Sequence, residues 1–303
     1  MPINILSKGS LFPEQLATDM FNLVRGKSSL AKLSGAAPIP FNGERVFTFN
    51  FDKEADLVAE NGAKSNGGAT VTPVNITPVK IEYGMRVSDE FVYASEEAQI
   101  QYLRAFAEGF AAKTARALDI MAFHGVNPRT GSSADSLNNK NFDDVIVNAV
   151  TYDSDTPQDN VVAAIAQVEA AEHEVTGMAM APAFKTALAS LKKGSSSYEL
   201  MFPELGWGST PGTLNGLPVD TNSTVSFNSN ADKAIVGNFR DFFRWGFAKE
   251  IPIEVIRYGN PDNDTDAGDL KGHNQVYIRG EAYLGWGILA PGAFSIIKSG
   301  VSG

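Results

Sequence analysis

Cysteine is absent from the 303-residue sequence, so disulfides, thiolate metal sites and cysteine nucleophiles are all excluded. Histidine is scarce: His124, His173 and His273 stand in unrelated contexts, and a histidine metal site would have to be assembled wholly by the fold. No segment approaches the roughly 18 consecutive apolar residues that would span a membrane. The first residues lack a basic region followed by a sustained apolar run. We therefore expect a protein made and kept in a cytoplasm, with no metal and no cofactor.

Positive charge is also in short supply. The chain carries 25 Lys and Arg against 35 Asp and Glu, a formal net charge of −10. A dedicated nucleic-acid-binding protein needs a basic patch, because neutralisation of phosphates supplies much of its affinity. The modest basic groups are most simply interpreted as solvated surface; they are Lys8, Arg25, Lys27 and Lys32, and the pair Lys192–Lys193. We expect a protein that can lie near nucleic acid but has no dedicated nucleic-acid-binding surface.

Motifs of catalysis and nucleotide binding are missing too. The sequence has neither a phosphate-binding P-loop nor a G-x-S-x-G nucleophile motif. A G-x-G-x-x-A pattern does occur at Gly285, Gly287 and Ala290, but Pro291 follows at once and too few residues remain for a β-α-β unit. We interpret it as a strand that ends in a turn. No catalytic constellation stands out, and we expect no enzyme.

An acidic loop is the one segment with a pattern typical of cation binding. Its carboxylates are Asp262, Asp264, Asp266 and Asp269, and the first three have the one-three-five spacing of a calcium loop. The sixth position is Ala267, where glycine is expected, and the twelfth is His273, where a bidentate glutamate belongs. We interpret the segment as a solvated turn between two strands, and cation binding remains the alternative.

The most regular pattern in the sequence predicts one long helix from Ser95 to the glycine at 125. Ser95 suits an N-cap, and Glu96 and Glu97 place negative charge where the helix dipole favours it. Gly125 suits the left-handed residue after a helix. At 1.5 Å per residue this helix would be roughly 43 Å long. Its apolar residues recur at helical steps of three and four: Ile100, Leu103, Phe106, Phe110, Ala111, Thr114, Leu118, Met121 and Ala122.

Residues 45–83 predict a long two-stranded hairpin. Apolar and polar residues alternate in the outgoing segment, and the return segment is again strand-like, with arms of about 12 residues on either side of a turn-rich tip at Glu60 to Gly68. An isolated two-stranded ribbon is marginal in water at best. Its apolar residues therefore need a cover from elsewhere, and repeated contacts in a closed assembly would provide one. Those residues are Phe47, Phe49, Phe51, Val58, Val71, Val74 and Ile76.

The remaining segments predict a broken N-terminal arm and an α/β lobe. Residues 1–44 include one short helical candidate, Pro13 to Val24, and a loop rich in glycine and proline. Helix and strand patterns alternate over about 100 residues from Thr156 onward, which is typical of a lobe around a central sheet. The chain is strand-rich from Ile251 to its end.

Taken in order, these segments resemble the HK-97-like major capsid protein of tailed bacteriophages. The resemblance covers nearly the whole chain. Residues 56–95 (DLVAENGAKSNGGATVTPVNITPVKIEYGMRVSDEFVYAS) are similar to that family's extended loop and its return strand, and LDIMAFHGVN resembles the end of its spine helix, with Asp119 and Gly125 in place. LNGLPV and AIVGNF resemble stretches of its axial domain, and NQVYIRGEAYLGWGILAPGAF resembles its C-terminal strand pair.

The resemblance implies an α+β fold with a particular division of the chain. The expected parts are an N-terminal arm (1–44), an extended β-hairpin loop (45–83), a peripheral domain with the spine helix (84–150), an α/β axial domain (151–250) and peripheral-domain strands with the C-terminal strand (251–303). Subunit contacts are expected from the hairpin residues named above together with Lys64, and helix packing from Leu103, Phe106, Phe110, Leu118 and Met121. The acidic loop, Asp262, Asp264, Asp266 and Asp269, is expected near a three-fold contact.

The function implied is that of a shell protein. Copies would form hexamers and pentamers of an icosahedral head that encloses double-stranded DNA without sequence-specific binding. Portal, scaffolding and decoration proteins are the expected partners, and assembly is expected in the bacterial host cytoplasm. Some family members cross-link a hairpin lysine to an asparagine. Lys64 lies at the tip and Asn260 and Asn263 lie in the acidic loop, but no required acid is identifiable, and an ordinary exposed lysine is the preferred interpretation.

Two alternatives stay open on the sequence alone. An encapsulin-like compartment shares the fold and holds protein cargo instead of DNA, although the long tip ENGAKSNGG and the length of the chain favour the viral interpretation. A soluble α/β enzyme that binds a cation through Asp262, Asp264 and His273 is the alternative from another class.

Overall fold

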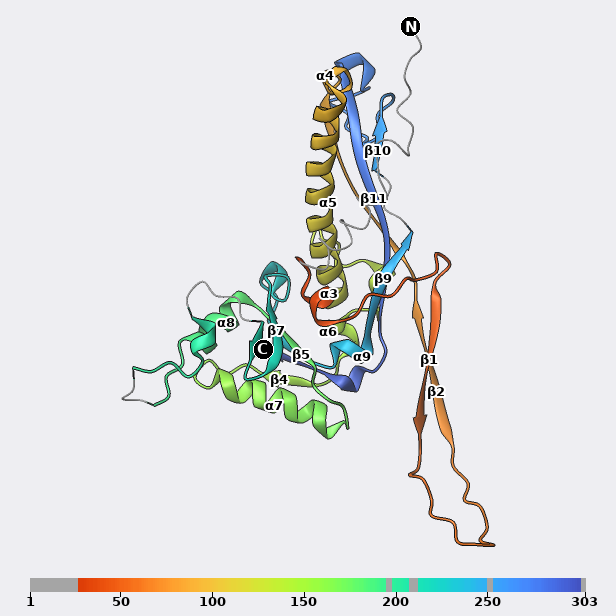
Figure 1. Ribbon diagram of the computed structural model, residues 1–303, viewed down its shortest axis with the longest axis vertical. Helices are drawn as coiled ribbons and strands as arrows, with labels where there is room; N and C mark the ends of the chain where they lie inside the picture. The colour runs from red at the N-terminus through yellow and green to blue at the C-terminus, as the bar shows by residue number, and fades with distance from the viewer. Residues whose placement is uncertain (1–26, 195–197, 207–211, 250–252, 301–303) are drawn as a thin grey trace.

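A computed structural model describes residues 27–194, 198–206, 212–249 and 253–300. A long upright helix lies beside long strands, a thin hairpin projects on one side, and an α/β lobe lies on the other (Figure 1). The helix predicted at 13–24 lies outside the described residues. Of the helices described, none is long and apolar enough to cross a membrane.

The upright element is helix α5, Glu96–His124, and it has the predicted ends. The Ser95 side chain accepts a hydrogen bond from the Ala98 backbone N–H and so caps the first turn. Gly125 ends the helix in the left-handed conformation, with φ of 63°. Ile100 departs from the prediction, because it is 41% exposed although it falls on the apolar repeat.

The hairpin consists of β1 (Glu44–Phe51) and β2 (Ala69–Ile76), paired antiparallel along their full length. Each arm has 8 residues, so the expected arms of about 12 residues are too long. Pairing stops where Asp52 and Gly68 exchange their last hydrogen bonds. The tip beyond them, residues 53–67, is rich in charged residues and glycine, which are poor strand formers.

The return segment does not continue the hairpin beyond Ile76. Strand β3 (Val79–Ser88) leaves the ribbon after Pro78, a residue that has no N–H to offer a ladder, and pairs with β11 (Gln275–Ile288). Strands β9 (Phe243–Lys249) and β10 (Ile253–Ile256) pair with β11 on its other edge. This long sheet lies beside α5 in Figure 1, on the side of the hairpin, and forms the second layer of the upright part.

A six-stranded sheet forms the lobe, in the order β4-β12-β8-β5-β7-β6. Its strands are β4 (Ala149–Thr151), β12 (Phe294–Lys298), β8 (Asp232–Gly237), β5 (Gly177–Met180), β7 (Leu217–Thr221) and β6 (Thr213–Leu214). Helices α7 (Pro157–Ala170) and α8 (Pro182–Ala189) belong to this lobe. The chain therefore divides less simply than expected: β12 lies in the lobe, whereas β9 belongs to the long sheet.

Short helices complete the fold. They are α3 (Ser29–Leu33), α4 (Glu90–Tyr93), α6 (Phe142–Val145) and α9 (Phe239–Phe242), with 3₁₀ turns η1 (Asp135–Leu137), η2 (Pro203–Leu205), η3 (Phe227–Ser229), η4 (Lys271–His273) and η5 (Pro291–Ala293). The described part of the N-terminal arm does not project from the subunit. Leu30 of α3 is fully buried, and residues 36–39 run along β9.

Two apolar cores hold these layers together. The larger one unites α5 with the long sheet and reaches the sheet of the lobe through Phe142, Phe239 and Phe294, whose rings pack edge to face and stacked. The smaller core lies inside the lobe around Phe184. Neither core includes the aromatic residues of the hairpin.

Candidate subunit interfaces and buried polar sites

One face of the hairpin is apolar and uncovered. Phe47, Phe49 and Phe51 alternate along β1 and are 53%, 62% and 74% exposed. The ladder pairs them with Pro73, Val71 and Ala69 of β2, so all six side chains share one face. A row of three exposed phenylalanines is unusual for a water-facing surface and is typical of a protein contact.

The opposite face of the hairpin packs against its own subunit at the base of the hairpin, which we call the root. Ile76 is fully buried, and Val74 is half-buried. A β-carbon at Gly287 would lie 2.7 Å from Cγ1 of Ile76, and one at Gly285 would lie 3.2 Å from its Cγ2. The two glycines of the apparent dinucleotide motif therefore form the seat of the hairpin. Ile76, expected at a subunit contact, is instead buried within its own chain.

The tip of the hairpin is exposed, with Leu57 at 96% and Val58 at 44%. Lys64 is exposed. The Asn260 amide is engaged elsewhere in its own chain, since its oxygen accepts from Arg86 Nη2 at 2.7 Å and its nitrogen donates to the Asp264 carbonyl at 2.9 Å. The interpretation of Lys64 as an ordinary surface lysine stays a prediction.

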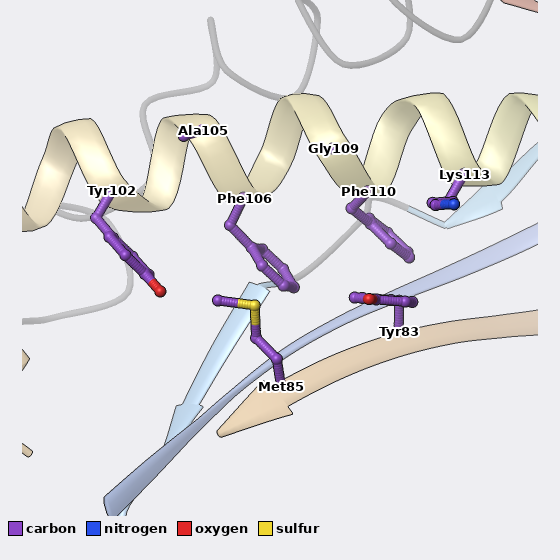
Figure 2. Close-up of a pocket in the computed structure, with 8 residues that line it drawn as sticks. All are labelled: Tyr83, Met85, Tyr102, Ala105, Phe106, Gly109, Phe110 and Lys113. Carbon is purple, nitrogen blue, oxygen red and sulfur yellow. The ribbon is translucent and has the colours of Figure 1, made fainter. Parts of the chain in front are cut away.

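A second uncovered apolar surface is a groove between α5 and β3, with a volume of about 350 Å³. Figure 2 shows Tyr102, Phe106 and Phe110 on one helix face, directed toward Tyr83 and Met85 of the sheet. Phe106 and Phe110 stack nearly parallel, with ring centroids 6.4 Å apart. Tyr83 and Tyr102 are 46% and 40% exposed, so this groove is open at its rim.

All five predicted spine-helix residues are buried, and two of them also border the groove. Leu103, Leu118 and Met121 are buried in the main core, as the apolar repeat predicts. Phe106 and Phe110 are also buried, yet they form the wall of the groove. Helix α5 therefore packs in the main core and also forms one wall of the open groove.

Arg86, a residue that no sequence pattern indicated, organises the acidic loop. Arg86 binds Asp262 through two nitrogens, at 2.6 and 2.8 Å, and also donates to the backbone carbonyls of Ala267 and Gly268. The hydrogen bond from Arg86 lowers the pKa of Asp262 to about 2. The two residues are 176 positions apart, so only the pairing of β3 with β11 brings them together.

The other carboxylates of this loop cap turns. Asp264 Oδ1 accepts the backbone N–H groups of Asp266 and Ala267, and Asp269 accepts those of Gly259, Lys271 and Gly272. Within the part of the chain that the structure describes, the loop carboxylates do not converge as a set of metal ligands. The arrangement favours a structural turn over the cation-binding alternative.

Asp119 is the buried polar anchor of the spine helix, and it is completely inaccessible. Its carboxylate accepts from the Ser28 hydroxyl at 2.5 Å, the Ser29 N–H at 2.9 Å and the Thr224 hydroxyl at 3.0 Å. Leu30 N–H and the Asn222 amide add longer contacts. Burial raises the pKa of Asp119 to about 6, although these hydrogen bonds oppose the shift. One carboxylate thus ties α3 and the loop after β7 to α5.

A second polar cluster lies at the C-terminal end of α5 and consists of His124, Asp143 and Asp232. His124 Nδ1 is 2.9 Å from Asp143 Oδ2 and 3.7 Å from Asp232 Oδ2. Burial and the adjacent Asp143 carboxylate raise the pKa of Asp232 to about 8. Sequence patterns do not predict this cluster, because its members come from α5, α6 and β8; a local signal is the aspartate that begins β8, two residues before its apolar run.

The family model described as the phage capsid family matches residues 8–299. A chain of Mycobacterium phage Ogopogo is 30% identical, with a TM-score of 0.76, over 90% of this chain and 92% of that one. A chain of Gordonia phage Cozz is 23% identical, with a TM-score of 0.73, over 91% and 87%. The capsid of an empty GTA particle is 15% identical, with a TM-score of 0.60, over 91% and 90%. No curated protein matches the sequence.

Proposed function

Because this chain belongs to the phage capsid family and is a major capsid protein with the HK-97-like fold, we propose that its copies form hexamers and pentamers. These rings close into an icosahedral shell around packaged double-stranded DNA. The observation that carries the proposal is the row of Phe47, Phe49 and Phe51, exposed on a ribbon whose other face is rooted in its own subunit.

Each copy has two apolar surfaces that a sister copy can cover. The phenylalanine face of the hairpin contributes to neither core, and Phe49 borders an open cleft of about 950 Å³ opposite Trp286 and Lys140. The groove between α5 and β3 offers the second surface. Burial of each exposed phenylalanine contributes about 2 kcal/mol. Many such contacts in a closed ring reinforce one another, because later contacts become intramolecular.

The two structural parts take different places in the proposed shell. The lobe around the six-stranded sheet, expected at 151–250, lies around the ring centre as an axial domain. The α5 layer, expected at 84–150 and 251–303, forms the periphery, with the acidic loop near a three-fold contact. The arm at 1–44 is proposed to contact another copy; residues 1–26 lie outside the described part of the chain, and Leu30 and Ala31 of α3 are buried in their own subunit.

The charge of the chain suits a container for DNA rather than a DNA-binding protein. A net charge of −10 per copy favours repulsion between an acidic inner surface and phosphates, so packaged DNA can slide during filling. Portal, scaffolding and decoration proteins are the proposed partners, and assembly takes place in the host cytoplasm. A map of an assembled particle tests the charge argument: an inner surface densely lined with Lys and Arg would contradict it.

The proposed role is structural, without a catalytic activity. Purified full-length protein should form megadalton particles that are closed and roughly round in negative-stain electron microscopy. Particles isolated from phage should contain DNA that resists added nuclease. A stable 32.4 kDa monomer at all concentrations would contradict the assembly proposal, whereas particles that hold protein cargo and no DNA would favour the encapsulin-like alternative.

A further inference from the structure

Three acidic and imidazole side chains from separate elements meet beneath the end of the spine helix. His124 is the last residue of α5, Asp143 belongs to α6 and Asp232 begins β8. We propose that His124, Asp143 and Asp232 form a binding site for a divalent transition-metal ion, with Zn²⁺ as the probe that fits best. The site is separate from both apolar surfaces and from the acidic loop.

The ligand atoms are already close enough for one ion. His124 Nδ1, one oxygen of Asp143 and one oxygen of Asp232 all lie within 4.8 Å of one another. Two ligands that share a tetrahedral zinc ion at about 2.0–2.2 Å lie a little over 3 Å apart. The distances from Nδ1 to the two carboxylates, 2.9 and 3.7 Å, bracket that value. Small side-chain rotations are therefore sufficient to close the site.

The Thr224 carbonyl fixes the orientation of the histidine ring. His124 Nε2 lies 2.9 Å from the Thr224 backbone carbonyl. A carbonyl only accepts hydrogen bonds, so Nε2 carries a proton and Nδ1 is the nitrogen that faces the two carboxylates; a metal ion there would replace the proton that the 2.9 Å contact with Asp143 requires. A histidine that donates its other N–H to a backbone carbonyl is the usual arrangement at protein metal sites.

One buried oxygen of the cluster lacks a partner. Asp232 is 2% exposed, and its Oδ2 accepts no hydrogen bond from any described residue. The Asn230 amide nitrogen instead contacts the other two side chains, at 2.9 Å from His124 Nδ1 and 3.0 Å from Asp143 Oδ2. Lys298, opposite Asp232 on β12, forms no ion pair with it in the described structure. A buried oxygen without a hydrogen-bond partner, 3.7 Å from the imidazole nitrogen, points to a cation that would replace the protons held in this cluster.

The donor set selects the class of ion. One imidazole nitrogen and two carboxylate oxygens suit zinc and its neighbours, whereas Ca²⁺ and Mg²⁺ prefer six or more oxygens. The Asp143 side chain is 30% exposed, which gives an ion and one water ligand a route from solvent. A bound ion would join α5, α6 and β8, and so would stabilise the junction between the long helix and the sheet of the lobe.

Zinc titration of the full-length protein, after treatment with EDTA and dialysis, tests the site by calorimetry. We expect one Zn²⁺ per chain and a higher melting temperature with zinc than with EDTA. Asp232→Asn keeps the shape of the side chain but removes one ligand charge, and should weaken binding at least about tenfold. His124→Gln is the second variant, and circular dichroism in EDTA establishes that each variant is folded.

The acidic loop provides matched controls. Asp264→Asn and His273→Gln change one carboxylate and one imidazole in the other acidic segment, and both should bind zinc as the wild type does. The proposal is overturned if wild-type protein binds no zinc, or if folded Asp232→Asn binds it equally well. Loss of binding in Asp264→Asn alone would also overturn it, because the ion would then belong to the loop.

Discussion

At the scale of single residues, Asp119 shows how a buried charge positions separate segments. Five uncharged donors surround its carboxylate, and they come from α3, from the residue before it and from the loop after β7. The hydrogen bonds favour the ionised form and burial opposes it. The raised pKa, about 6, indicates that burial outweighs the donors.

Asp119→Asn should therefore change how stability depends on pH. A carboxyl group with a raised pKa in the folded state contributes most below its ordinary pKa, here 3.8, and that contribution is lost as the pH rises through about 6. Between about pH 4 and pH 7 the wild type should lose about 2 kcal/mol that the variant does not lose. Urea unfolding of both proteins at the two pH values measures the difference. A difference that stays constant with pH would show that the donors fully offset burial.

At the scale of elements, sequence patterns predict the features that depend on contacts between neighbouring residues. The ends of α5 follow from Ser95 and Gly125, since each residue satisfies backbone groups within one turn of itself. The exposed Phe47, Phe49 and Phe51 likewise follow from alternation along one strand. The length of the hairpin arms does not, because apolar residues in the tip imitate a strand pattern that the charged and glycine residues interrupt.

Contacts between residues far apart in the chain could not be predicted from sequence patterns. β12 resembles the other C-terminal strands in composition, yet it pairs with β8 and β4 in the lobe. Arg86 and Asp262, or His124 and Asp232, belong to unrelated segments until the sheets form. The sequence predicts only that Gly287 lies in a strand that ends in a turn. The structure shows why glycine is needed there: a β-carbon at Gly287 would collide with Ile76, more than two hundred residues earlier in the chain.

Gly287→Ala should destabilise the root of the hairpin. The added β-carbon would lie 2.7 Å from Cγ1 of Ile76, a branched side chain held in the core, so the hairpin must shift. Overpacking of this kind costs about 1–3 kcal/mol. Urea or thermal unfolding of the subunit measures the loss, and an unchanged stability would mean that the root is loosely packed.

Gly109→Ala is the matched control and should act in the opposite direction. Gly109 lies in the middle of α5, and nothing lies within 4 Å of an added β-carbon. Alanine loses less backbone entropy than glycine in a helix, which is worth about 0.5–1 kcal/mol. The variant should therefore be more stable by that amount in the same unfolding measurement. A loss of stability would show that the groove beside α5 closes over this position.

At the scale of the whole molecule, the subunit separates the contacts that fold it from the contacts left for assembly. The two cores hold α5 and both larger sheets, and Ile76 at the root of the hairpin is buried against β11. The outer face of the ribbon contributes to neither core, although it carries three of the 19 phenylalanines. Folding and assembly therefore depend on opposite faces of one hairpin, and substitutions can separate them.

Phe49→Asp tests that separation on the outer face. Phe49 is 62% exposed in the subunit, so the substitution should change subunit stability by about 0.5 kcal/mol or less. In an assembled shell it would bury an unpaired charge, and particles should fail to form or should dissociate at low protein concentration. Phe49→Leu keeps an apolar side chain and should still assemble. Analytical ultracentrifugation of all three proteins follows the particles.

Ile76→Ala, on the inner face of the same strand, should give the converse result. Removal of a fully buried isoleucine costs about 2–5 kcal/mol of subunit stability. Its side chain leaves the outer face unaltered, so the fraction that remains folded should still form particles. The decisive comparison is between the two melting curves and the two sedimentation profiles. If Phe49→Asp unfolds the subunit while Ile76→Ala blocks assembly of a stable one, the assignment of the two faces is reversed and the proposed interface is wrong.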